Sequence, residues 1–213
     1  MELTVGPRPG GGTEVVRRTL DVIGGSVLLV LTAPLLGLGA LVVAIAGGRP
    51  VFFAHKRLGR HGRPFRCWKL RTMRVDAEEA LDRDPQLLAS HRSNGFKLPT
   101  SSDPRVEWWG RILRRTYVDE LPQLFNVVAG CMSLVGPRPI VADELELFGE
   151  ERNVLLTVKP GVFGAWNSRG RDRPSYPERA DLELDYVRNR AWSRDVRILI
   201  RSIRAVLQGQ DDL

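Results

Sequence analysis

The chain has 213 residues, of which 43% are hydrophobic and 27% are charged, so it can form one ordinary domain with an appendage and does not have the composition of a disordered protein. Its net charge is +7, and only four of its 32 basic residues are lysines. Arginine suits phosphate-bearing partners such as nucleotides or lipid headgroups, although a solvated basic surface accounts equally well for any single arginine.

The N-terminal segment has two parts. Residues 1–12 are rich in glycine and proline and predict a flexible tail, whereas residues 13–50 predict a membrane anchor because residues 22–46 carry no charge. That run is too long for the apolar region of a cleaved signal peptide. A straight span and a re-entrant helix hairpin remain open. Pro34 lies near the middle of the run and basic residues flank both of its ends, which slightly favours a hairpin broken near Pro34.

Residues 51–213 predict a single small catalytic domain of the α+β class, rich in helices. Two short apolar runs indicate a strand pair within residues 51–74. Apolar periodicity predicts helices over residues 75–90, 106–115, 119–129 and 144–156 and from Arg179 onward, with loops over 93–104 and 159–177. The segment SRDVRILIRSIRAVLQ near the end predicts a basic amphipathic helix, which is suited either to a membrane interface or to packing on the core.

The adjacent carboxylates Asp119 and Glu120 are the first candidates for a functional site. Pro122 follows them, and an acidic residue before an early proline is typical of a helix start, so a purely structural role as a cap is a strong alternative. The same geometry holds a carboxylate rigidly, with its neighbour pointing about 100° away. Arg114 and Arg138 are among the nearby basic residues suited to phosphate oxygens. This combination indicates phosphoryl transfer with a hard divalent cation such as Mg²⁺.

Four segments resemble a known family, and together with the apolar run they cover nearly the whole chain. They are KRLGRHGRPFRCWKLRTM (56–73), DPRVEWWGRILRRTYVDELPQLFNVVAGCMSLVGPRP (103–139), KPGVFGAWNSRGR (159–171) and LELDYVRNRAWSRDVRILIRS (182–202). The chain is similar to the bacterial sugar transferases, the monotopic phosphoglycosyl transferases. The DELPQLxN and MSLVGPRP strings are long and specific.

The resemblance implies a membrane helix that is re-entrant and breaks at a proline, with the catalytic domain on the cytoplasmic face of the bacterial plasma membrane. It implies transfer of a phosphosugar from a nucleotide diphosphate sugar, commonly a UDP-sugar, to polyprenol phosphate, with Mg²⁺ as cofactor. Asp119 would be the nucleophile and a metal ligand, and Glu120 its partner. The phosphates would be held by Arg114, Arg138 and Arg171. Membrane lipid and, as a possible partner, a second copy of the chain in a homodimer complete the expected partners.

The sequence departs from the family pattern at four positions near these motifs. Cys131 replaces a usual Asp, Phe163 a usual Thr, Asn167 a usual Gln and Glu183 a usual Asp. Because Cys131 removes a charge, a catalytically silent membrane scaffold of the same fold is the alternative function, although the intact Asp-Glu pair disfavours it. Nucleic-acid binding is not expected, since the basic charge is accompanied by an uncharged membrane-length run and no nucleic-acid motif.

Overall fold

The computed structural model describes residues 11–96, 98–170 and 172–207, and its first element is a long apolar helix. Helix α1 (Gly11–Val42) continues through a π-helical turn, η1 (Val43–Gly47). The segment Gly12–Gly47 is long and apolar enough to cross a membrane, and only 11% of its most apolar stretch is buried. The predicted apolar helix is thus confirmed. Gly11 and Gly12, assigned by sequence to the tail, are helical, and residues 1–10 lie outside the described residues.

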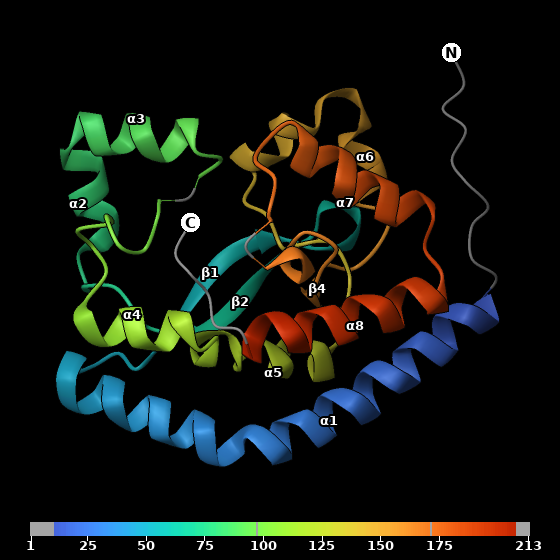
Figure 1. Ribbon diagram of the computed structural model, residues 1–213, viewed down its shortest axis with the longest axis horizontal. Helices are drawn as coiled ribbons and strands as arrows, with labels where there is room; N and C mark the ends of the chain where they lie inside the picture. The colour runs from blue at the N-terminus through green and yellow to red at the C-terminus, as the bar shows by residue number, and fades with distance from the viewer. Residues whose placement is uncertain (1–10, 97, 171, 208–213) are drawn as a thin grey trace.

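Pro34 lies inside α1 and does not end it. Figure 1 shows α1, in blue, as one bent helix along one side of the molecule. Because proline removes a donor from the helix ladder, it is a recognised cause of such a bend. The Thr32 hydroxyl, nearby, donates to the Leu28 carbonyl at 2.7 Å. The helix does not reverse direction between Gly11 and Val42, so the hairpin form of the prediction is not confirmed.

The C-terminal half of α1 packs directly against the domain. Leu36 and Val43 belong to a core cluster with Leu70, Trp109, Leu113 and Val118. Gly39 permits the close approach, since a Cβ added there would lie 2.8 Å from a methyl carbon of Val118. The apolar helix is therefore part of the core that supports the segment around residue 118.

Two small sheets form the β part of the fold. Strands β1 (Phe52–Leu58) and β2 (Pro64–Leu70) are antiparallel, with His55 opposite Cys67, and are joined through η2 (Arg60–Gly62). This confirms the predicted strand pair. Strands β3 (Ser133–Val135) and β4 (Gly161–Phe163) are parallel and were not predicted, because three residues are too few to show a strand pattern.

The helices of the domain differ from the prediction mainly in where they break. The expected helix over 75–90 is two helices, α2 (Ala77–Arg83) and α3 (Pro85–Ser93), because Asp84 caps α3 by accepting from the Gln86 and Leu87 amides at 3.0 Å. The expected helix over 144–156 is instead the 3₁₀ segment η4 (Asp143–Glu151), kinked at Gly149, followed by α6 (Arg152–Leu155). Helix α4 (Trp108–Arg115) agrees with its prediction.

The last two helices close the core. Helix α7 (Glu178–Arg188) contributes Leu184 and Tyr186 to the largest core cluster, and α8 (Trp192–Leu207) contributes Ile198. Three apolar residues of the predicted stripe on α8, however, are about half exposed: Val196, Ile200 and Ile203. Of the two alternatives left open for this stripe, packing on the core does not apply to these three residues, because the buried face of α8 is formed by Asp195, Ile198, Ser202 and Ala205.

Candidate active site

Asp119 lies in a 3₁₀ turn, η3 (Val118–Glu120), between α4 and α5 (Gln123–Ala129). Tyr117, directly before it, adopts a left-handed backbone conformation (φ 58°), which turns the chain out of α4. The prediction of one helix over 119–129 is therefore wrong at its start, since α5 begins four residues later, after Pro122. Asp119 is not the cap of α5, and its position is fixed by Val118 in the core cluster below it.

The Asp119 carboxylate is buried without a hydrogen-bond partner for its Oδ1 atom among the described residues. Burial, supported by the charge of Glu120, raises the pKa of Asp119 to about 6 against the opposing effects of Lys69 and Arg114. A carboxylate with an unused oxygen and a raised pKa is an expensive group to keep in a fold, and such groups concentrate at functional sites.

Glu120 points into an ion pair with a residue that the sequence reasoning missed. The Lys69 Nζ atom donates to Glu120 Oε1 at 2.6 Å, and both side chains are partly buried. Lys69 comes from β2, and Cys67, two residues earlier on the same face of the strand, lies beside it in the pocket. Alternation along β2, a predicted strand, was the signal that a lysine and a cysteine share one face there.

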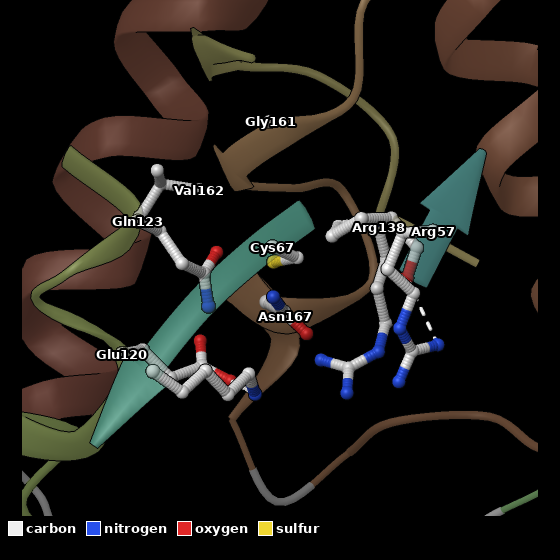
Figure 2. A pocket seen from close by; sticks show the side chains of 10 residues that line it. Arg57, Cys67, Glu120, Gln123, Arg138, Gly161, Val162 and Asn167 are labelled. Atoms are coloured by element: carbon white, nitrogen blue, oxygen red, sulfur yellow. Dashed lines mark hydrogen bonds and ion pairs between the residues drawn. The ribbon is translucent and has the colours of Figure 1, made fainter. Parts of the chain in front are cut away.

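These side chains line a hollow of about 260 Å³ that is open to solvent. Figure 2 shows Arg57 and Arg138 together on one side of it and Glu120 and Gln123 on the other, with Cys67 and Asn167 between them. The lining contains three cations and one carboxylate. Burial and then Arg138 lower the pKa of Arg57, which means that the two guanidiniums repel each other. A phosphate oxyanion between them would relieve this repulsion.

Arg138 is held in place from two directions. It belongs to the Gly-Pro-Arg-Pro turn after β3, where its backbone N–H donates to Glu183 Oε1 at 3.4 Å. Its guanidinium lies 5.5 Å from the centre of the Trp166 ring. Burial opposes the charge of Arg138, but Glu120 and Glu144 outweigh it and raise the pKa. Burial also raises the pKa of Glu183 to about 7. The structure therefore brings Glu120 and Arg138, two of the predicted site residues, to the same pocket.

The other two predicted arginines are not among the described residues that line the pocket. Arg114 does not line the pocket; its Nε atom donates to the Thr72 hydroxyl at 2.9 Å. Burial lowers the pKa of Arg114, and Asp119 is the first group that opposes this shift. Arg114 thus lies close enough to Asp119 for their charges to interact, although it does not line the pocket. Arg171 lies outside the described residues.

The four residues that depart from the family pattern differ in their positions relative to the pocket. Cys131 is exposed and does not line the pocket, so its missing charge lies away from the cations described above. Asn167 does line the pocket, and its Oδ1 atom is buried without a described partner. Glu183 is buried behind Arg138, and Phe163 ends β4.

The donor set is compatible with Mg²⁺ bound together with substrate phosphates. Among the described residues no group of three or more His, Cys, Asp or Glu side chains is arranged to hold a metal by itself. Magnesium in phosphoryl-transfer sites is commonly bound by one or two carboxylates plus phosphate oxygens, with the remaining positions filled by water. Asp119 Oδ1, which is buried without a described partner, and Glu120, which lines the pocket, are the carboxylates that would contribute to such a site.

A family model described as bacterial sugar transferase matches residues 12–209. The chain belongs to the bacterial sugar transferase family. The chain is similar to three relatives whose names describe them more specifically. The undecaprenyl-phosphate galactose phosphotransferase of Salmonella typhimurium is 40% identical over 92% of the chain. The exopolysaccharide production protein ExoY of Rhizobium meliloti is 39% identical over 96% of the chain, and the UDP-glucose:undecaprenyl-phosphate glucose-1-phosphate transferase of Caulobacter vibrioides is 33% identical over 95%.

These sugar transferases differ in length. The chain spans 41% of the Salmonella relative, 90% of ExoY and 73% of the Caulobacter relative. Each of the three matches covers at least 92% of this chain, so each spans most of the apolar helix and the segment from Asp119 to Arg138.

Proposed function

We propose that the chain transfers a phosphosugar from a nucleotide diphosphate sugar, in the simplest case a UDP-sugar, to polyprenol phosphate. This would be the first membrane step of glycoconjugate or exopolysaccharide synthesis. The observation that carries the proposal is a buried carboxylate with a free oxygen, Asp119, next to a pocket lined by Arg57, Lys69 and Arg138. The names of the Salmonella and Caulobacter relatives, which contain undecaprenyl phosphate, support the substrate classes.

The proposed reaction is a double displacement at phosphorus. An Asp119 carboxylate oxygen forms a bond to the β-phosphorus while the bond from that phosphorus to the bridging oxygen breaks, and the nucleoside monophosphate leaves with that oxygen. A phosphate oxygen of polyprenol phosphate then attacks the aspartyl phosphosugar. The bond to Asp119 breaks, which frees the carboxylate and yields the polyprenyl diphosphate sugar.

The surrounding residues take roles that follow from their charges. Arg57 and Arg138 bind the donor phosphates and stabilise the charge that develops as the nucleotide leaves. Lys69 and Arg114 both favour the ionised form of Asp119, which is the nucleophile. Glu120 is the dyad partner and holds Lys69 at the pocket edge through their ion pair. Magnesium, when bound at Asp119, would supply further positive charge for the phosphate oxygens.

We also propose that α1 enters the membrane as one bent helix and that both of its ends lie on the same side of the bilayer. The reason is that both of its ends contact one domain. Near the start, the Arg18 guanidinium donates to the Val127 carbonyl at 2.6 Å, and beyond the other end Arg71 donates to the Gly48 carbonyl at 3.0 Å. A helix that crossed a bilayer core of about 30 Å would place its ends on opposite sides, where one small domain cannot bind both.

Exposed apolar side chains of other helices support an interfacial position for the domain. In Figure 1, α4, α5 and α8 lie along α1. Large apolar residues on these three helices are 49–63% exposed: Trp108, Ile112, Phe125, Val196, Ile200 and Ile203. Large exposed apolar side chains of this kind are suited to the headgroup boundary of a bilayer. The proposed location is the cytoplasmic face of the bacterial plasma membrane.

The activity is tested with purified chain, Mg²⁺, polyprenol phosphate and a panel of UDP-sugars, by following release of UMP. Incubation with donor alone is then analysed by intact mass spectrometry, where the proposal requires addition of one phosphosugar. Asp119→Asn should abolish both signals, and the exposed control Asp143→Asn should keep them. Unchanged turnover in Asp119→Asn would refute the nucleophile, and no turnover with the whole panel would favour the silent scaffold.

Topology is tested by attaching a membrane-impermeant thiol reagent to single cysteines placed in the tail and at the C-terminus. Native Cys67 and Cys131 are first replaced by serine. The proposal predicts that both sites react from the same side of sealed vesicles. Reaction from opposite sides would establish a straight span.

A further inference from the structure

A second hollow lies away from the candidate active site, where the first turns of α1 meet the connection between α7 and α8 (Figure 1). It is partly open to solvent and has a cavity volume of only about 20 Å³, so it suits a small group. Its lining consists of charged side chains and one serine, with four cations and two carboxylates. An excess of positive charge in a partly enclosed hollow favours an anion.

Most of these charges already have partners that fasten α1 to the domain. Arg17 pairs with Asp195 of α8, and the two guanidinium ends of Arg18 donate to the Val127 and Val128 carbonyls at 2.6 and 2.7 Å. Asp21 Oδ1 accepts from the Ser133 hydroxyl at 2.9 Å and from the Leu134 amide at 2.8 Å. These contacts bring the charged side chains together, but they leave nitrogen atoms of other lining residues without acceptors among the described residues.

Two donors remain without acceptors within the ranges that the structure describes. Lys159, half-buried at the entrance to β4, makes no hydrogen bond or ion pair there through its Nζ atom. Arg190 pairs with Glu14 through Nη1 at 3.2 Å, but its buried Nε atom has no acceptor. Burial and then the Arg18 guanidinium lower the pKa of Lys159. An acceptor with negative charge between Lys159 and the arginines is what the hollow lacks.

The position of the hollow along α1 indicates which anions reach it. Asp21 directly precedes the uncharged run that begins at Val22, and Arg18 lies four residues before that run, about 6 Å along the helix axis. If the run lies in lipid, the hollow lies at the height of the phosphate groups. Basic pockets beside membrane helices on the cytoplasmic side are typical sites for anionic headgroups.

We propose that this hollow binds a phosphate oxyanion through Lys159, Arg18 and Arg190, supplied by an anionic lipid headgroup or by free phosphate. The bound anion would neutralise the excess charge at the junction of α1 with α5 and α8 and so strengthen the attachment of the membrane helix to the domain. Lys159 is distinct from the residues that line the candidate active site, although β4, which follows it, contributes Gly161 to that pocket.

The test uses the full chain in neutral detergent micelles. Its thermal unfolding midpoint is measured against rising dioleoyl phosphatidylglycerol, against dioleoyl phosphatidylcholine, which has a phosphate but no net charge, and against inorganic phosphate. We expect a saturable rise with phosphatidylglycerol that exceeds the response to phosphatidylcholine. Lys159→Ala should weaken the apparent affinity at least about tenfold, because it removes a charged hydrogen bond. Lys159→Arg should retain most of it.

Lys56→Ala is the matched control, because Lys56 is an exposed lysine on β1 that does not line the hollow. A response confined to phosphatidylglycerol assigns the site to lipid, and an equal response to inorganic phosphate assigns it to a free anion. Absence of both responses in the unmodified chain overturns the proposal, as does equal affinity in the Lys159 and Lys56 variants. Release of UMP is recorded separately, so an inactive chain that still binds the lipid leaves this inference intact.

Discussion

Replacing Asp119 by asparagine should stabilise the protein while it abolishes turnover. Asp119 is buried, and its pKa is raised from an ordinary value of 3.8 to about 6, first by burial and then by Glu120. Because the folded state holds this proton more tightly than the unfolded state, the contribution of Asp119 to stability is fully present below pH 3.8. It is lost as the pH rises through about 6. At neutral pH the carboxylate is therefore a cost to the fold, and a neutral side chain of the same shape removes it.

The size of the effect follows from the two pKa values. At about 1.4 kcal/mol per pH unit, a rise from 3.8 to about 6 corresponds to about 3 kcal/mol at pH 8. This is an upper value, since the unfolded chain and local relaxation both reduce it. For a chain of this length, 1 kcal/mol moves the unfolding midpoint by roughly 2–4 °C, so the midpoint of Asp119→Asn should lie up to roughly 10 °C above that of the unmodified chain.

The assay compares unfolding midpoints of the two proteins in detergent at several pH values from 4 to 8. The difference between them should be largest at pH 8 and should become small at pH 4, because pH 4 lies well below the folded pKa of about 6 and close to the ordinary value of 3.8 that applies to the unfolded chain. In parallel, kcat/KM of the unmodified chain should fall about tenfold per pH unit below about 6, because protonated Asp119 cannot attack phosphorus.

A difference in midpoint that does not change with pH would refute this reasoning, even if activity is lost. A lower midpoint for Asp119→Asn at pH 8 would refute it as well, because it would mean that the carboxylate is well solvated or paired in the fold. Asp143→Asn is again the control, since Asp143 is exposed and its replacement should not change the midpoint.

Three further predictions test the pocket and its support. Lys69→Met removes the cation of the ion pair with Glu120 and should lower kcat at least about tenfold. Lys69→Arg keeps the charge and should retain part of the activity. Equal rates for the two variants would contradict a role of the charge. Arg138→Lys keeps the charge but loses the planar fork, so KM for the nucleotide sugar should rise about tenfold, and an unchanged KM would place the donor phosphates elsewhere. Gly39→Val should lower the free energy of unfolding by about 1–3 kcal/mol, because the new side chain would collide with the core under η3. Gly37 faces open space, so Gly37→Val should change that free energy by less than about 1 kcal/mol. Equal unfolding midpoints for the two variants would show that α1 does not pack as described.

The parts of the fold that the sequence predicts are those in which one local pattern decides the structure. The uncharged run gives α1, and the two apolar runs around a Gly-Arg connection give β1 and β2. Breaks inside helical patterns were harder to predict. Asp84 followed by Pro85 is a cap signal, yet the acidic and apolar periodicity continues across it. At Asp119 the helical pattern also continues, but packing of Val118 against Leu70 and α1 sets a 3₁₀ turn in its place.

The site was predictable in its carboxylates and only in part in its cations. Asp119 and Glu120 stand next to each other in the sequence, and Arg138 lies in a rigid turn. Lys69 and Arg57 come from two strands about fifty and sixty residues before Glu120, and no local spacing connects them to it. Only the antiparallel pairing of β1 with β2, and the packing of β2 on η3 and α5, brings these cations to the carboxylates.

The apolar helix has two roles that depend on the same contacts. One face of α1 is exposed and suited to lipid, while Leu36, Gly39 and Val43 pack under Leu70 and Val118. Val118 is the residue before Asp119, so the surface that buries the membrane helix also fixes the height of the carboxylate above it. A nucleophile that must meet a soluble nucleotide sugar and a lipid phosphate has to sit near the headgroup boundary. Because α1 packs directly against Val118 of η3, movement of the helix in the bilayer would displace η3 with it. If α1 lies in the membrane as proposed, its packing in the core cluster would therefore couple its position in the bilayer to that of the candidate active site.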